Sequence, residues 1–510
     1  NRVKNNLPDT LLDQVKQKIQ SFDGDQTRFI YQELDKPIIK IQGLSGTGKT
    51  ELLLHKIKEL YQKNDNFKIF VTCHNKILAD ALKKRIPAFF DFMKVTKQIE
   101  WNERFWCANA WGHYQHPNSG LYSFICSTYG LNFYSFREAS FDGACKYAIE
   151  KLKTKYPDGI PPKLDYIFID ECQDFKDSFV ELCSMVTSKQ VFLAGDIFQS
   201  IFAENIARDY TADYFLTKCY RTDPKTLMFA HALGLGLFEE TPLRWLSKGN
   251  WEACGYDCEE KLTDEEIILK RQPVRRFVDL PSDYKSVVIK QYQQDNICEQ
   301  VSLSIRNILE ENSTCTVDDI CIILLDNNQN TYTIANKLEF TIGRDFEWQV
   351  NKAYESKKSV PNTLFISNRN NVKGLEYAFV ICITNGLIDN YTYRNALYTM
   401  LTRSFLQTIF MVQEGDNGMM ESIMKGYNEI MQEQKMTIHI PSADDIERIA
   451  TRFNEAKSRP LKDIIKETIN GLEIDEQKAE NMLNVALRMN WADCSEEEIR
   501  EKVEMLNKIW

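Results

Sequence analysis

The sequence has no excess of basic residues, no long apolar run and no paired cysteine pattern. Its 63 lysines and arginines against 73 aspartates and glutamates give a formal net charge of −10. This balance excludes a uniformly basic nucleic-acid coat but allows a local basic groove. No run of 18 apolar residues is present, so we expect no transmembrane helix and no membrane partner. The N-terminal residues contain no signal-peptide core.

The 14 cysteines are scattered singly along the chain. Only Cys254 and Cys258 form a CxxxC pattern, and no second pair accompanies them. We interpret the two as ordinary thiols rather than as zinc ligands. Unpaired cysteines in a chain of this length favour a reduced, cytoplasmic protein.

What is present is an ordinary globular composition, with 510 residues of which 43% are hydrophobic and 27% charged. The length predicts three or four domains. Short apolar, β-branched runs recur and are typical of strands in a buried parallel sheet. These runs lie at 37–41, 67–72, 164–169, 191–194, 286–289, 320–325 and 379–383. Helical patterns between them, such as 76–86 and 298–309, predict an α/β fold with sheets covered on both faces.

Three stretches interrupt this alternation. Residues 101–162 are rich in aromatic residues, and we predict an insertion whose aromatics mostly form a small core, with base stacking as the alternative. A second, acidic insertion is predicted at about 235–282, and a helical appendage at 431–510. The appendage carries a net charge of −5 and residues 239–266 carry −6. The acidic excess therefore lies on the parts least suited to contact phosphates.

Residues 43–50 fit the pattern G-x-x-x-x-G-K-[ST] between a predicted strand and a predicted helix. Glycines let backbone N–H groups surround a phosphate, and the helix N-terminus adds positive potential. Lys49 is expected to reach the β- and γ-phosphates and Thr50 to hold Mg²⁺, which a plain glycine-rich turn would not do. The predicted nucleotide-binding residues of this loop are Gly43, Ser45, Gly46, Thr47, Gly48, Lys49 and Thr50.

Acidic residues stand at the tip of the strand at 164–169. Asp170 is expected to orient Mg²⁺, and the adjacent Glu171 to align or deprotonate water. A third strand ends at Gly195-Asp196, with Gln199 nearby. Taken alone, Gln199 would be interpreted as a surface amide.

The order of these pieces resembles that of superfamily 1 nucleic-acid helicases of the UvrD/Rep type, in a compact form. Eight patterns stand in family order: 22–26 (Q motif), 43–50 (I), 71–76 (Ia), 170–175 (II), 195–202 (III), 219–222 (IV), 373–377 (V) and 396–404 (VI). The resemblance implies two RecA-like P-loop ATPase domains with ATP between them. The first would comprise residues 1–100 plus 163–216, and the second residues 217–430.

The resemblance also implies roles at the ATP site. Gln26 would read adenine, Tyr220 would stack on it, and Glu376 would contact the ribose or phosphates. The implied catalytic groups, with Gln199 as sensor of the γ-phosphate and the two arginines as fingers, are Lys49, Glu171, Gln199, Arg221 and Arg403. Guanidinium groups that close from a separate domain couple hydrolysis to domain motion.

The motifs that contact a nucleic-acid strand in this family have drifted more than the ATP motifs. Glu204 stands where a tryptophan is common, and His74 where a threonine is usual. The strand contacts that the resemblance implies are Thr72, Asn75, Trp111, Phe202 and Asn370.

Two functional hypotheses follow from these patterns. The first is an ATP-dependent translocase or helicase on single-stranded DNA, or RNA, with the 3′-to-5′ polarity of the family. The second is a regulatory ATPase with little unwinding of its own. It would partner a nuclease in a bacterial anti-phage defence or repair complex through the helical tail.

Overall fold

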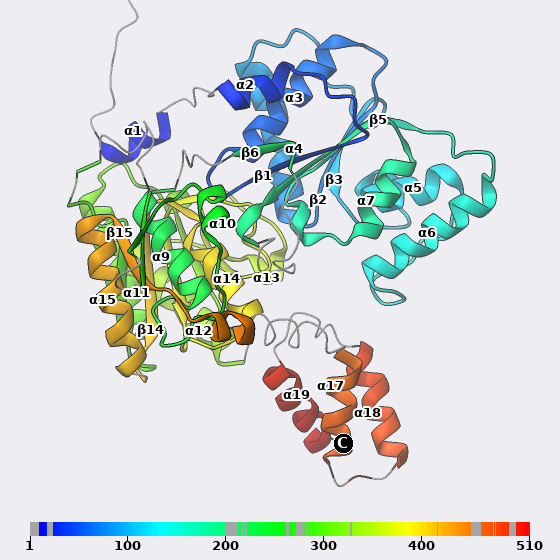
Figure 1. Cartoon of the computed structure of the whole chain (residues 1–510). Coiled ribbons are helices and arrows are strands. Elements are labelled where there is room, and N and C mark those ends of the chain that lie inside the picture. The colour runs from blue at the N-terminus through cyan, green and yellow to red at the C-terminus, as the bar shows by residue number, and fades with distance from the viewer. Residues whose placement is uncertain are drawn as a thin grey trace, which may run out of the picture.

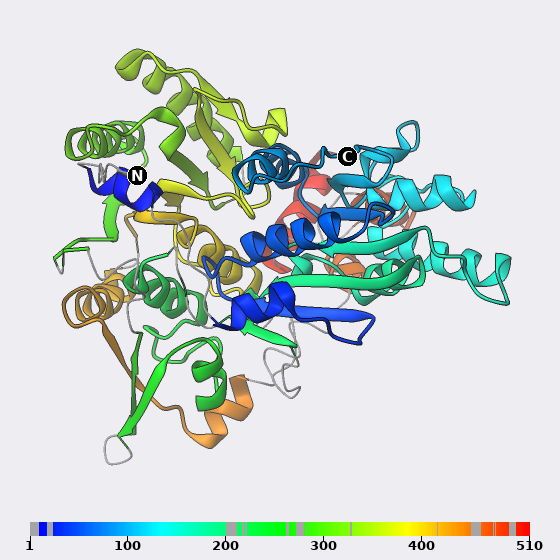
Figure 2. The ribbon, with the colours of Figure 1, turned by 90° about the horizontal axis from the view of Figure 1, so that it is seen from above.

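The computed structural model describes residues 10–17, 24–199, 212–216, 219, 222–261, 265–271, 280–281, 283–326, 329–415, 417–449, 461–472, 474, 476–488 and 496–509. Within them, the chain builds two parallel sheets of six strands each, covered by helices (Figure 1). The two sheets lie next to each other in the view from above (Figure 2). The predicted α/β class with two RecA-like domains is therefore confirmed.

The first sheet has the strand order β3-β2-β4-β5-β1-β6. Its strands are β1 (Ile38–Gly43), β2 (Ile69–Cys73), β3 (Phe105–Asn109), β4 (Leu164–Ile169), β5 (Thr187–Asp196) and β6 (Tyr214–Leu216). Every residue of β2 is buried, because an apolar strand in the middle of a parallel sheet is covered on both faces. The four strands predicted for this part of the chain lie in β1, β2, β4 and β5. Its helices are α2 (Gly24–Tyr31), α3 (Lys49–Lys63), α4 (Lys76–Phe92), α5 (Leu121–Tyr129), α6 (Phe141–Lys155) and α7 (Asp177–Met185).

The second sheet has the strand order β11-β12-β10-β13-β14-β9. Its strands are β9 (Val287–Tyr292), β10 (Ile320–Leu324), β11 (Val350–Lys352), β12 (Leu364–Asn368), β13 (Tyr377–Thr384) and β14 (Ser404–Gln413). The three remaining predicted strands lie in β9, β10 and β13. Its helices are α9 (Pro224–Leu235), α11 (Ile297–Glu311), α12 (Gln329–Phe346), α13 (Ala353–Ser356), α14 (Tyr391–Leu401) and α15 (Asn417–Glu433). Separate apolar clusters fill the two faces of this sheet.

The aromatic stretch at 101–162 differs from the prediction at its beginning. Phe105–Asn109 is not part of an insertion, because it pairs with β2 as the edge strand β3 of the first sheet. Helices α5 and α6 then pack on that sheet and share a buried cluster with Phe70 and Ile167. The aromatics thus enlarge the domain core instead of forming a separate one. Tyr114 and Phe136 are exceptions, with exposed fractions of 68% and 75%.

The acidic insertion and the start of the tail form one small antiparallel sheet. It comprises β7 (Asp257–Lys261), β8 (Glu266–Lys270) and β15 (Lys435–His439), and it lies beside α10 (Lys248–Ala253). The predicted helical appendage therefore does not begin at residue 431. Three later helices, α17 (Leu461–Asn470), α18 (Glu476–Arg488) and α19 (Glu496–Ile509), pack around a core of their own and lie apart from both sheets in Figure 1.

The first described helix, α1 (Leu11–Gln17), packs on the second sheet, although we predicted residues 1–100 to belong to the first domain. Leu12 and Val15 are buried in the cluster that covers the second sheet. Lys16 forms an ion pair with Asp319 at 2.7 Å. The chain thus contacts the second domain before it enters the first. Among the described residues, none of the helices has the length and apolar character that crossing a membrane requires.

Candidate active site

The loop at 43–50 joins β1 to α3 and has the conformation that its glycines permit. Gly46 and Gly48 adopt φ angles of +75° and +84°, which disfavour residues with a Cβ atom. At Gly46 a Cβ would also lie 2.7 Å from the hydroxyl oxygen of Thr222 and 2.9 Å from the sulfur of Cys219. The tip of the loop therefore touches the segment at 219–222, which supplies motif IV.

Lys49 begins α3 and points back into the loop. Its ammonium group donates hydrogen bonds to the carbonyl oxygens of Gly43 at 3.0 Å and Leu44 at 2.8 Å, and its side chain is buried. Among the described residues, the hydrogen-bond partners of this ammonium group are neutral carbonyl oxygens, and phosphate oxygens would supply an anionic partner. This geometry fits the predicted contact with phosphates.

Thr50 and Asp170 bring two oxygen groups together at the end of β4. The Thr50 hydroxyl donates to the Asp170 carboxylate at 2.7 Å. Burial, followed by the charge of Glu171, raises the pKa of Asp170. A cation bound at this pair would stabilise the ionised carboxylate, and hydroxyl and carboxylate oxygens are the ligands that Mg²⁺ prefers. The donor set therefore fits Mg²⁺.

Gln173 connects three groups of the site and was not among the predicted site residues. Its amide nitrogen donates to Glu171 at 2.6 Å and to Gln199 at 3.2 Å, while its amide oxygen accepts from the backbone N–H of Asp196 at 3.0 Å. Glu171 itself adopts a left-handed φ of +53° at the tip of β4. In the sequence, the feature that pointed to Gln173 as a site residue was its position two residues after the acidic pair.

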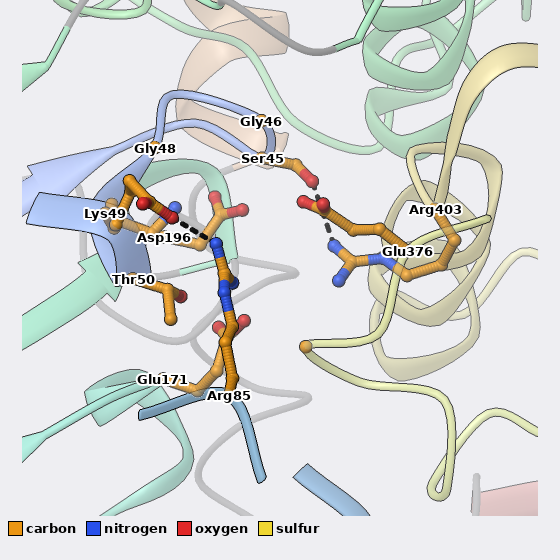
Figure 3. A pocket seen from close by; sticks show the side chains of 12 residues that line it. Ser45, Gly46, Gly48, Lys49, Thr50, Arg85, Glu171, Asp196, Glu376 and Arg403 are labelled. Carbon is orange, nitrogen blue, oxygen red and sulfur yellow. Dashed lines mark hydrogen bonds and ion pairs between the residues drawn. The ribbon is translucent and has the colours of Figure 1, made fainter. Parts of the chain in front are cut away.

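The second domain contributes side chains to the same pocket. Arg403 and Glu376 face the loop at 43–50 across it (Figure 3). The guanidinium of Arg403 donates to the Ser45 hydroxyl at 3.0 Å and to the carbonyl oxygen of Thr399 at 2.7 Å, and the side chain is buried. The pocket thus carries arginine and glutamate from one sheet and the phosphate loop from the other.

A second arginine lines the pocket from the first domain. Arg85 of α4 points into it and pairs with Glu51, the residue after Thr50 (Figure 3). Neither residue was predicted to belong to the site. Their positions on two different helices, more than thirty residues apart in the sequence, left no pattern by which to find them.

Gln26 lies against the loop, as its predicted role requires. Its side chain is buried, and its amide nitrogen donates to the carbonyl oxygen of Thr47 at 3.3 Å. Tyr220, Arg221 and Phe202 lie outside the described residues, so their predicted roles stay predictions. The sulfur of the neighbouring Cys219 lies 3.1 Å from the carbonyl oxygen of Ser45.

The predicted nucleic-acid contacts occupy different environments. Thr72 is buried at the end of β2, with an exposed fraction of 1%. Asn75 caps α4 and donates to the carbonyl oxygen of Asn370 at 2.9 Å, which joins motif Ia to the segment just before motif V. Asn370 itself is exposed. Trp111 is half-buried, donates to the carbonyl oxygen of Tyr134 at 2.9 Å and packs on Phe141.

The two domains also meet beside the pocket through motif V. Lys373 pairs with Asp174 at 2.6 Å. Gly374 has a φ of +74°, and a Cβ there would lie 2.5 Å from the side chain of Leu78 on α4. In the part of the chain that the structure describes, three or more histidine, cysteine, aspartate or glutamate side chains nowhere gather as a metal-binding group.

Comparisons with known families match both halves of this pocket. Residues 26–205 match a family described as an AAA domain, and residues 363–411 match the UvrD-like helicase C-terminal domain. No curated protein matches the sequence.

Two solved structures of Dbp5 from S. cerevisiae bound to RNA and ADP–BeF3 align with most of this chain. A variant of Dbp5 is 9% identical, covering 84% of this chain and 93% of its own, with a TM-score of 0.41. The other Dbp5 structure is 10% identical with the same coverage and a TM-score of 0.39.

Proposed function

Because this chain is an ATP-hydrolysing P-loop enzyme of the UvrD-like helicase type, we propose that it moves along single-stranded DNA with 3′-to-5′ polarity. The observation that carries the proposal is the shared pocket, in which Arg403 from the second domain reaches Ser45 of the phosphate loop. A guanidinium that arrives from a separate domain stabilises the charge of phosphoryl transfer only when the domains are closed. Hydrolysis and domain movement are thereby linked.

Several residues in and beside the pocket then have a task. Lys49 and Arg403 neutralise the phosphate oxygens, and Glu171 aligns the attacking water, oriented by the amide of Gln173. Thr50 and Asp170 would hold Mg²⁺, which supplies further charge stabilisation. Gln26 reads the adenine edge beside Thr47.

The strand would run across the motifs that meet between the two domains. Asn75 and Asn370 already join there, so a strand that passes this point contacts both domains. Tyr114 and Phe136 follow the edge strand β3 in the sequence and expose aromatic rings, and aromatic rings stack on bases without sequence preference.

Steady-state ATPase assays with and without single-stranded DNA or RNA test whether a nucleic-acid strand stimulates hydrolysis. Strand displacement on duplexes with 3′ or 5′ overhangs tests movement along the strand and its polarity. We expect turnover to rise with DNA and displacement to require the 3′ overhang. Lys49→Ala serves as the control without hydrolysis. Turnover that ignores both nucleic acids, together with absent displacement, would contradict the translocase.

The separate core of α17–α19 favours a second candidate function. A helical module that folds on its own core and lies apart from both sheets is suited to dock a partner protein. In that case the chain is a regulatory ATPase for a nuclease in a defence or repair complex. Deletion of residues 461–510 would then abolish the partner's stimulation of ATPase while leaving basal turnover unchanged.

A further inference from the structure

The turn that carries Gln199 enters the core of the second domain. At the end of β5, the Asp196 carboxylate accepts hydrogen bonds from the backbone N–H groups of Phe198 at 2.9 Å and Gln199 at 3.3 Å. These two bonds fix both residues on one turn. Phe198 is fully buried, and its neighbours belong to the apolar cluster of the second domain rather than to the first-sheet core.

Phe198 stacks on two aromatic rings of the second domain. The ring of His231, on α9, lies 4.2 Å away at an angle of 21°, and that of Tyr398, on α14, lies 4.3 Å away at 39°. The Tyr398 hydroxyl also lies 3.3 and 3.4 Å from the two oxygens of the Asp196 carboxylate. The second domain therefore holds this turn both by its aromatic ring and by its acidic group.

The same helix leads directly to Arg403. Arg403 follows α14, and its guanidinium donates to the carbonyl oxygen of Thr399, the residue next to Tyr398. Phe198 thus directly precedes Gln199, and Tyr398 lies five residues before Arg403. A shift of Phe198 against Tyr398 changes the distance between Gln199 and Arg403.

The buried ring of His231 packs against the ring of Phe198. It is fully buried, and its Nδ1 lies 2.5 Å from the hydroxyl oxygen of Tyr256. Burial, followed by the charge of Arg271, lowers the pKa of His231, so its ring stays neutral at physiological pH. Tyr256 directly precedes β7 of the small antiparallel sheet. The ring of His231 is therefore held by a residue of the acidic insertion.

We propose that Phe198 and His231 are positioning residues that hold Gln199 and Arg403 in register for ATP hydrolysis. The inference rests on the proposed roles of Gln199 and Arg403 at the γ-phosphate. Neither Phe198 nor His231 is among the described residues that line the pocket, so we expect their effect to be on alignment and not on nucleotide affinity.

Phe198→Leu removes the stack and keeps an apolar side chain. Since a small displacement of catalytic groups is costly, we expect kcat to fall about 10- to 100-fold. The KM for ATP and the affinity for a fluorescent ATP analogue are expected to stay within about twofold of wild type, because uniform binding is unaffected.

Phe168→Leu is the matched control, because Phe168 is equally buried and stacks on Phe192 at 4.6 Å inside the first-sheet core. Thermal unfolding of both variants measures the stability that each loses. If Phe168→Leu lowers kcat as much as Phe198→Leu does, the effect is structural and the proposal is overturned. If wild type itself does not hydrolyse ATP, the proposed function fails first and the inference fails with it.

His231 provides a conservative rescue. His231→Ala removes the ring that stacks on Phe198, and we expect it to lower kcat in the same way as Phe198→Leu does. His231→Phe restores an aromatic ring without the nitrogen atoms, and we expect kcat to return to within about threefold of wild type, as the stacked geometry requires. A loss in His231→Phe as large as in His231→Ala would overturn the stacking role.

Discussion

Gln173 holds Glu171 in place through a single amide group, and its removal gives the sharpest test of the site. In Gln173→Ala, Glu171 loses its 2.6 Å hydrogen bond, and the Asp196 N–H loses its acceptor. Hydrogen bonds to charged groups contribute about 1.5–3 kcal/mol. At about 1.4 kcal/mol for each factor of ten in rate, a bond that matters fully in the transition state predicts a loss in kcat of about 10- to 100-fold.

Steady-state ATPase kinetics measure the effect of Gln173→Ala on turnover, and binding of a fluorescent ATP analogue measures its effect on nucleotide affinity. We expect kcat to fall while the KM for ATP stays within about threefold, because Gln173 bonds to the acid that aligns water and not to the phosphate loop. Gln190→Ala is the control, since Gln190 also donates from its amide to backbone carbonyls but lies at the opposite end of β5. A kcat within twofold of wild type, or a KM that rises as much as kcat falls, would refute the reasoning.

Three further predictions concern the charges of the site. Arg403→Ala should lower turnover while ATP binding, measured by fluorescence titration, stays largely intact; equal loss of both would argue against a finger. Asp174→Asn and Lys373→Met should affect kcat non-additively in a double-mutant cycle, with a coupling of about 0.5–3 kcal/mol, because the residues form one contact between domains. Without Mg²⁺ and nucleotide, burial and the charge of Glu171 raise the pKa of Asp170 to about 6, so the folded protein loses stability as pH rises from about 4 to 6. Asp170→Asn should therefore exceed wild type in unfolding free energy at pH 7 by roughly 3 kcal/mol, and by less at pH 5, in urea titrations. An equal difference at both pH values would contradict the raised pKa.

The sequence predicted those parts of the protein that local pattern determines. Apolar runs placed seven strands, and the glycine pattern at 43–50 placed the phosphate loop, because both depend on neighbouring residues. Edge strand β3 was missed because its five residues lie within an aromatic-rich stretch, where an insertion was the simpler interpretation. The pairing of β15 with β8 was missed because contacts between residues so far apart in sequence leave no local signal.

The site shows the same division. The residues that the family pattern names, such as Lys49, Glu171 and Arg403, line one pocket. Arg85, Gln173 and the stack around Phe198 depend on how helices and turns pack in three dimensions. Such contacts emerge only from the folded chain.

The docking of α1 sets a limit on how far the two domains can separate. Leu12 and Val15 anchor α1 in the second domain, while Gln26 and its helix α2 belong to the first. The chain from Gln17 to Gly24 spans at most about 25 Å when fully extended. This length limits the distance between α1 and α2, and any wider separation of the two domains requires α1 to leave its site on the second domain and break the ion pair between Lys16 and Asp319.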